Sequence, residues 1–253
     1  MQVRNKPWYL QHSSQLFFFP FFVFSIVKKL SGSVLDIDAP TPLSSYNPFE
    51  INTPLTRLDL SGKMMSVRDV RSLSKDLKVN GALTSLNVSS SNISDTGAAY
   101  LSEAIKVNGT LTSLNVTFNN ISDSGAAYLS EALKVNGTLS SLYVSSNNIG
   151  DSGAAYLSEA LKVNGTLISL FVSSNNIGDS GAAYLSEALK VNGTLTSLYV
   201  SSNNIGVSGA AHLSEARKLN RRLTVHVQDL LGFRLQRNVR SFSKKVFSNS
   251  EER

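Results

Sequence analysis

The sequence contains no cysteine among its 253 residues, so it has neither a disulfide framework nor a thiolate site for metal or redox chemistry. This absence favours a reducing compartment. Histidine is scarce, and His12, His212 and His226 show no pattern typical of a Ser or Cys nucleophile. We therefore expect no catalytic residue, no metal site and no cofactor, and the sequence does not indicate an enzyme.

A hydrophobic run long enough to span a membrane is also lacking. The longest apolar stretch, Leu16–Val27, has twelve residues and contains Pro20, whereas a spanning helix needs about 20. Its length suits the core of a signal peptide, with Ser31-Gly32-Ser33 as small cleavage residues, but Lys28-Lys29 directly after it does not. The alternatives for residues 1–33 are a signal or anchor, a hydrophobic N-terminal cap, and an unstructured leader.

What dominates the chain instead is one repeated unit. A segment of 28 residues recurs six times, and repeats four and five differ at only two positions, Ser140/Ile168 and Tyr143/Phe171. The repeats begin at Leu55, Leu83, Leu111, Leu139, Leu167 and Leu195. A fixed period of this length is typical of a solenoid, in which each unit packs only against its neighbours.

Each repeat contains one strand and one helix. In repeat four, Leu139, Leu142 and Val144 alternate with small polar residues, which predicts a strand with one buried face. Asn147 follows in a tight turn, where we expect its buried side chain to bond the backbone of the neighbouring repeat.

The second half of the repeat has helical periodicity. Asp151 or Ser152 is the expected N-cap, and Asn164-Gly165 is expected to end the helix in the left-handed conformation. The buried stripe of this helix comprises Gly153, Ala154, Leu157, Ala160 and Leu161. One repeat buries too few apolar side chains to offset the entropy of ordering it, so the repeats must stack, with paired strands on the concave side and helices on the convex side.

The motif LxxLxVxxNxIxDxGAxxLxxALxxN resembles the leucine-rich repeat of the ribonuclease-inhibitor type. It is similar to repeats in ribonuclease inhibitor, the NOD-like receptors and Ran GTPase-activating protein. The resemblance implies an α/β leucine-rich repeat horseshoe that binds other proteins through its concave parallel sheet. Ser61-Gly62-Lys63-Met64 is not a phosphate-binding loop, so the ATPase module of NOD-like receptors is missing.

We expect four regions. A leader over residues 1–33 and a Pro-rich, irregular lead-in over 34–54 precede the repeats at 55–222, and a basic tail follows at 223–253. From Arg217 to the end, ten basic and three acidic residues give a net charge of +7, against +6 for the whole chain. The tail has the apolar stripe of a capping helix, and contact with nucleic acid, an anionic membrane or an acidic partner is the alternative.

The candidate binding residues lie on the concave face, at the position between the last two apolar residues of each strand. There the repeats carry Asp59, Asn87, Asn115, Tyr143, Phe171 and Tyr199, and Phe118 adds an aromatic near a turn. Strands lie about 4.8 Å apart, so the last three aromatic side chains should form an exposed ladder. Aromatic residues are favoured interface anchors, although neutral drift at positions free of packing also explains the variation. The predicted partner-binding residues are Asn87, Asn115, Phe118, Tyr143, Phe171 and Tyr199.

Other recurring residues have structural explanations. The helix residues Tyr100, Tyr128, Tyr156 and Tyr184 are expected to pack between adjacent helices. Eight N-x-S/T sequons occur, most of them as part of the repeat motif, and they matter only if the chain enters the secretory route. These sequons are at Asn87, Asn92, Asn108, Asn115, Asn120, Asn136, Asn164 and Asn192.

The sequence thus favours a non-catalytic scaffold or adaptor, in the cytoplasm, that binds a protein on its concave face, without a small-molecule substrate and as a monomer rather than an oligomer. One alternative is a regulator of a small GTPase or of innate-immune-type signalling. Another is a secreted or membrane-anchored recognition protein that uses the Phe-rich segment.

Overall fold

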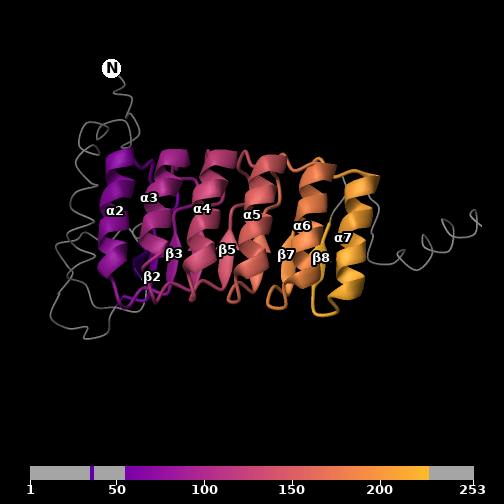
Figure 1. Cartoon of the computed structure of the whole chain (residues 1–253). Coiled ribbons are helices and arrows are strands. Elements are labelled where there is room, and N and C mark those ends of the chain that lie inside the picture. The colour runs from indigo at the N-terminus through magenta and orange to yellow at the C-terminus, as the bar shows by residue number, and fades with distance from the viewer. Residues whose placement is uncertain (1–34, 37–54, 228–253) are drawn as a thin grey trace, which may run out of the picture.

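The computed structural model describes residues 35–36 and 55–227, in which strands and helices alternate along one axis (Figure 1). The strands are β1 (Leu35–Asp36), β2 (Arg57–Asp59), β3 (Ser85–Asn87), β4 (Ser113–Asn115), β5 (Ser141–Tyr143), β6 (Ser169–Phe171), β7 (Ser197–Tyr199) and β8 (Thr224–His226). The helices are α2 (Val67–Val79), α3 (Asp95–Ile105), α4 (Asp123–Val135), α5 (Asp151–Val163), α6 (Asp179–Val191) and α7 (Val207–Leu219).

All eight strands form one open parallel sheet, and each strand pairs with the next one in the chain. The register places equivalent residues side by side, as for Leu114 and Leu142. The helices stand in a single row along the sheet (Figure 1). Within the described residues, each helix contacts no other helix than its immediate neighbours, as expected of a solenoid.

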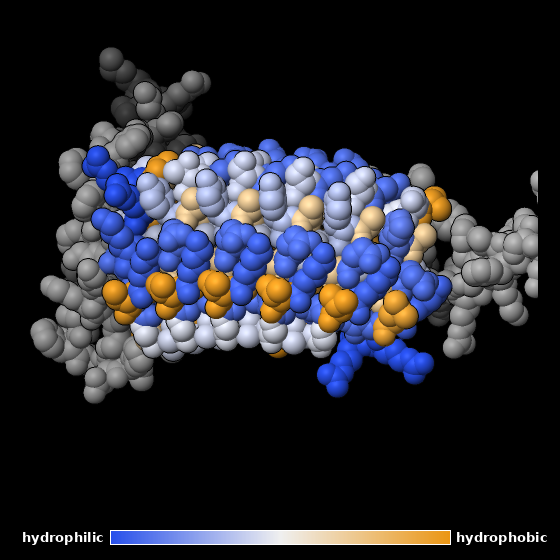
Figure 2. Space-filling view, in the orientation of Figure 1, coloured by the Kyte–Doolittle hydropathy of each residue, from blue (hydrophilic) through white to orange (hydrophobic). Residues whose placement is uncertain are grey.

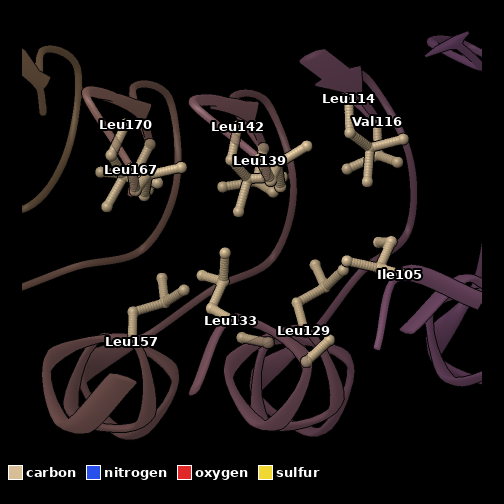
Figure 3. Close-up of a cluster of buried hydrophobic side chains, with 14 of the residues drawn as sticks. Ile105, Leu114, Val116, Leu129, Leu133, Leu139, Leu142, Leu157, Leu167 and Leu170 are labelled. Carbon is tan, nitrogen blue, oxygen red and sulfur yellow. The ribbon is translucent and has the colours of Figure 1, made fainter. Parts of the chain in front are cut away.

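The core lies between the sheet and the helix row. Strand residues such as Leu139 and Leu142 point toward helix residues such as Leu129 and Leu133 (Figure 3), and all four are at least 98% buried. Alternation in the strand and a 3.6-residue period in the helix bring these side chains to the same layer. The α/β solenoid expected from the sequence is confirmed.

The buried turn asparagines connect successive repeats. Asn147 donates from Nδ2 to the Val116 carbonyl at 3.0 Å, and its Oδ1 accepts from the Ile121 amide at 3.0 Å. Both partners belong to the preceding repeat, so the expected bonding to a neighbouring backbone is confirmed. A second row of asparagines does the same at the helix ends, where Asn164 donates to the Leu133 carbonyl at 2.7 Å.

The N-cap prediction for Asp151 and Ser152 is wrong. The helix begins at Asp151 after an N-cap residue, Gly150, that has no side chain to cap with. The oxygen comes from the preceding repeat: Oδ1 of Asp123 accepts from the amides of Gly150 at 2.6 Å and Gly153 at 2.9 Å. Stacked helices bring each aspartate to the start of the next helix, a contact that is invisible within one repeat.

The same arrangement explains both end helices. The described residues contain no helix before α2, which caps itself through a reciprocal pair between Ser66 and Asp69. In the last helix, α7, the position of the capping aspartate is occupied by Val207. The described chain has no further helix after α7, so an aspartate there would have no described helix to cap.

The predicted left-handed end at Asn164-Gly165 is also wrong. Asn164 is extended, with φ −74° and ψ 124°, and among described glycines only Gly62 has a positive φ. The left-handed residue instead lies in the turn after the strand. At this position φ lies between 52° and 55° in Ser90, Phe118, Ser146, Ser174 and Ser202.

Several sequence predictions fall outside the described residues, namely those on the apolar segment 16–27, most of the lead-in and the tail beyond Val227. The sheet extends on both sides of the expected repeat region, because β1 pairs with β2 and β8 pairs with β7. No helix in the described ranges is long and apolar enough to cross a membrane. The same ranges contain no group of three acidic or histidine residues placed to hold a metal ion.

Candidate functional site

The outward side of the sheet, here called the strand face, carries one central row of side chains. The row follows the strand pairing, so each member lies beside its equivalent in the next repeat. The row consists of Asp59, Asn87, Asn115, Tyr143, Phe171, Tyr199 and His226. It divides into a polar half on β2–β4 and an aromatic half on β5–β8.

The polar half is held by hydrogen bonds along and across strands. Asn87 donates from Nδ2 to Asp59 at 2.9 Å, and the Ser61 amide donates to Asp59 at 2.8 Å. Burial raises the pKa of the Asp59 carboxyl, but these bonds and the nearby charge of Lys63 outweigh it and hold the pKa below its ordinary value. The charge of Asp59 is therefore already satisfied within the protein.

The aromatic half, here called the aromatic ladder, consists of Tyr143, Phe171, Tyr199 and His226. The ring centroids are 4.2, 4.3 and 4.0 Å apart in that order, and the ring planes deviate by 10°, 9° and 3°. The three rings predicted from the sequence are stacked but only partly exposed, because each covers the face of the next. The ladder therefore presents ring edges and polar tips to solvent, not ring faces.

Sequence reasoning missed His226. A strict 28-residue period places Val227, not His226, level with Tyr199, but β8 pairs with a spacing of 27 residues. The loop between α7 and β8 is one residue shorter, and a shift by one residue exchanges the two faces of a strand. The sequence feature that could have revealed His226 is the segment Thr224-Val225-His226, which has the same polar–apolar–aromatic pattern as Ser197-Leu198-Tyr199.

Rows of hydroxyl groups border the central row on both sides. One row is Ser85, Ser113, Ser141, Ser169 and Ser197, and the other is Ser89, Thr117, Ser145, Ser173 and Ser201. Side chains two residues apart in a strand share a face. From β3 to β7, these three rows contain no charged side chain. Contacts on this surface must depend on shape, apolar area and hydrogen bonds.

Phe118 lies beyond the end of β4, three residues after Asn115. Its side chain is 66% exposed and its φ is 54°, a left-handed conformation that is unfavourable for a bulky residue. In the other described repeats this left-handed position is occupied by serine, or by Gly62 in the first repeat. Of the six predicted site residues, five lie in the central row and Phe118 lies in the turn after β4.

The helix side is a second exposed surface with a different character. The prediction that the helix tyrosines pack between helices holds only in part, since Tyr128, Tyr156 and Tyr184 are 48–52% exposed. Exposed apolar residues recur near the helix ends, from Val79 to Leu219. Figure 2 shows them as separate patches on a hydrophilic surface. Single exposed apolar side chains are common in proteins, so the continuous aromatic ladder is the stronger candidate site.

Comparisons with known proteins agree with this architecture. A family model described as Leucine Rich repeat matches residues 82–102, 107–130, 135–158, 163–186 and 191–214. The chain therefore contains leucine-rich repeats, arranged as an open α/β solenoid. No curated protein matches the chain.

Two solved structures are among those similar to this chain. One is titled leiomodin-1 actin-binding site 2, with a TM-score of 0.53 and 20% identity over 75% of this chain and 99% of that chain. The tropomodulin C-terminal domain of Caenorhabditis elegans has a TM-score of 0.49 and 21% identity, over 60% of this chain and 93% of that chain. At this identity the leiomodin-1 likeness establishes the fold alone.

Proposed function

We propose that this chain is a non-catalytic scaffold or adaptor of the ribonuclease-inhibitor subtype that holds a protein partner on its strand face. The observation that carries the proposal is the aromatic ladder. Four rings in mutual contact form an apolar strip on an otherwise hydroxyl-rich surface, and aromatic side chains with polar tips are frequent anchors of protein interfaces.

The charge distribution supports a partner that is recognised without ion pairs. The three rows of the strand face from β3 to β7 are uncharged, so the interaction should persist at about 1 M salt, where the Debye length is about 3 Å. The leiomodin-1 domain is titled as an actin-binding site, which makes actin one protein to include among the candidates tested.

Affinity capture with the full chain tests the proposal. The test variant changes Tyr143, Phe171 and Tyr199 to Ser, and the control variant changes the exposed helix residues Tyr128, Tyr156 and Tyr184 to Ser. We expect a specific partner to be reduced at least tenfold by the first variant, a loss of about 1.4 kcal/mol, and retained by the second. Equal recovery with wild type and test variant, both folded by circular dichroism, would refute the proposal.

We also propose a cytoplasmic location, which the sequons can test. Asn108, Asn136, Asn164 and Asn192 are 94% or more buried, and each donates its side-chain amide to the preceding repeat. Of the eight sequon asparagines, only Asn92 and Asn120 are exposed. We expect no gel shift with N-glycosidase. A shift that disappears in the variant Asn92→Gln with Asn120→Gln would place the chain in the secretory route instead.

A further inference from the structure

The aromatic ladder ends abruptly at Tyr143, whose neighbour in the central row is Asn115. The two rings beyond it, Phe171 and Tyr199, each have a ring stacked on both faces. Tyr143 has a stacked ring on one face only. An asparagine side chain ends at its amide, well short of a phenol ring, so the outer part of the second Tyr143 face lies open. We call this boundary between Asn115 and Tyr143 the step.

The step also contains an unused hydrogen-bond donor. Oδ1 of Asn115 accepts from the Thr117 amide at 2.9 Å, which turns Nδ2 away from that backbone. Within the described chain, Nδ2 of Asn115 has no acceptor. The equivalent Nδ2 of Asn87 differs, since it donates to Asp59. A free donor thus lies beside a free ring face.

Phe118 is the second aromatic residue near the step. It follows Asn115 on the same repeat, remains 66% exposed, and adopts the left-handed backbone that serine, or Gly62 in the first repeat, adopts elsewhere. This backbone conformation is unfavourable for a bulky residue, and because the side chain is exposed, no burial of apolar area offsets its free-energy cost. The observation favours a role for Phe118 in contact with another molecule over a role in folding.

We propose that a planar aromatic side chain of the protein partner stacks on the free face of Tyr143, above Asn115. A backbone carbonyl of the same partner segment accepts from Nδ2 of Asn115, and Phe118 contacts that segment. This inference rests on the proposed function and names the chemistry of the partner. It makes the step the only place on the described part of the ladder, apart from the outer side of His226, where another ring can stack face to face.

A cationic group fits this site less well than a neutral ring. An arginine guanidinium also stacks on aromatic faces, but burying its positive charge is costly without a carboxylate to pair with it. The strand face from β3 to β7 has no such carboxylate. Asp59 lies two strands away and already accepts from Ser61 and Asn87.

The substitution Asn115→Tyr provides the sharpest test. Its ring would extend the ladder by one member and cover the free face, while Tyr143 and the rest of the ladder stay in place. The comparison variant Asn87→Tyr makes the same chemical change one strand further away. There the new ring would lie about 9.6 Å from Tyr143, two strand spacings, and would leave room for an inserted ring between them.

The probe is N-acetyl-tryptophanamide, followed by NMR on the ¹⁵N-labelled full chain. We expect saturable shifts of the Asn115 side-chain amide and the Tyr143 backbone amide, with an affinity at least about tenfold weaker in Asn115→Tyr and equal or stronger in Asn87→Tyr. N-acetyl-leucinamide and N-acetyl-argininamide should bind at least about tenfold more weakly. The variant Tyr143→Leu, which removes the ring face, should also lose binding if Asn115→Tyr fails to fold.

Equal binding of the tryptophan probe to wild type, Asn115→Tyr and Tyr143→Leu would overturn the inference, as would equal binding of the arginine probe to wild type. Failure of the proposed function is distinguishable. A partner lost by the triple serine variant but fully retained by Asn115→Tyr leaves the function standing and refutes the step. If the probe binds at the step but the triple variant retains the partner, the proposed function is refuted, and the step remains only as a stacking site for aromatic groups that this partner does not use.

Discussion

The capping of each helix by the preceding repeat predicts where a mutation will act. Oδ1 of Asp151 accepts from the amides of Gly178 at 2.7 Å and Gly181 at 2.9 Å, both at the start of α6. The substitution Asp151→Ala removes both bonds. Loss of a helix cap costs about 0.5–2 kcal/mol, and hydrogen bonds to a charged group contribute about 1.5–3 kcal/mol each. We therefore expect destabilisation of about 2 kcal/mol.

For a folded unit of this size, a loss of about 2 kcal/mol lowers Tm by about 4–8 °C. Hydrogen exchange read by mass spectrometry locates the loss. Although Asp151 is the first residue of α5, we expect faster exchange of the Gly178 and Gly181 amides at the start of α6. The start of α5 should change little, because Asp123 still accepts from Gly150 and Gly153.

Ser152→Ala is the matched control. Ser152 is exposed and adjacent to Asp151 in the same helical turn, so its removal should leave Tm within about 1–2 °C, as for surface changes within about 0.5 kcal/mol. Faster exchange confined to Gly150–Gly153 in Asp151→Ala would mean that the aspartate caps its own helix. A Tm equal to that of the wild type would mean that these bonds contribute nothing net. Either result would refute the reasoning.

Three further predictions follow from single contacts. Gly153→Ala should destabilise the fold by about 1–3 kcal/mol, because the new Cβ would lie 2.6 Å from Oδ1 of Asp123. Gly165→Ala should be neutral or slightly stabilising, because nothing lies within 4 Å of its Cβ. Chemical denaturation compares the unfolding free energies of the two variants. Asn147→Ala should cost about 3–5 kcal/mol, because it leaves several buried backbone groups unpaired, and a cost below about 1 kcal/mol in urea unfolding would contradict this. Folding lowers the pKa of Asp59, so the stabilisation by this carboxylate is present above its unfolded pKa of about 3.8 and is lost as the pH falls through its folded pKa. Asp59→Asn should therefore reduce the fall of the unfolding free energy at acid pH. An unchanged fall in the variant would exclude a contribution of Asp59.

The fold could be predicted because the two-residue period of the strand and the 3.6-residue period of the helix are both visible within a single repeat. Alternating residues around Leu142 and helical spacing around Leu157 each bury one face, and six repeats in register leave one way to stack them. What could not be predicted were contacts between repeats. The aspartate at the start of one helix bonds the next helix, and no pattern inside a 28-residue unit distinguishes this from capping its own amides.

The candidate site was predictable to a similar extent. Strand pairing follows from the repeat, so the alignment of Tyr143, Phe171 and Tyr199 could be anticipated. The orientation of the rings could not be anticipated, and neither could the partial burial of their faces that follows from it. His226 was missed because one deleted residue in the last loop changes which side chain faces outward. The left-handed backbone of Phe118 likewise depends on the turn geometry, and the serine at this position in repeats two, four, five and six gives no sign of it in the sequence.

Neutral drift is the simplest alternative explanation for variation on the strand face, and the helices argue against it. The helices α4, α5 and α6 have the identical sequence DSGAAYLSEALKV. Yet they include exposed positions, such as Val135, Val163 and Val191 at 65–68% exposure, that packing does not protect. Drift free of function should have changed these positions as readily as Asn115, Tyr143 and Phe171. The changes among these three repeats instead concentrate on the strand face and its turns, as expected if a partner contacts that face.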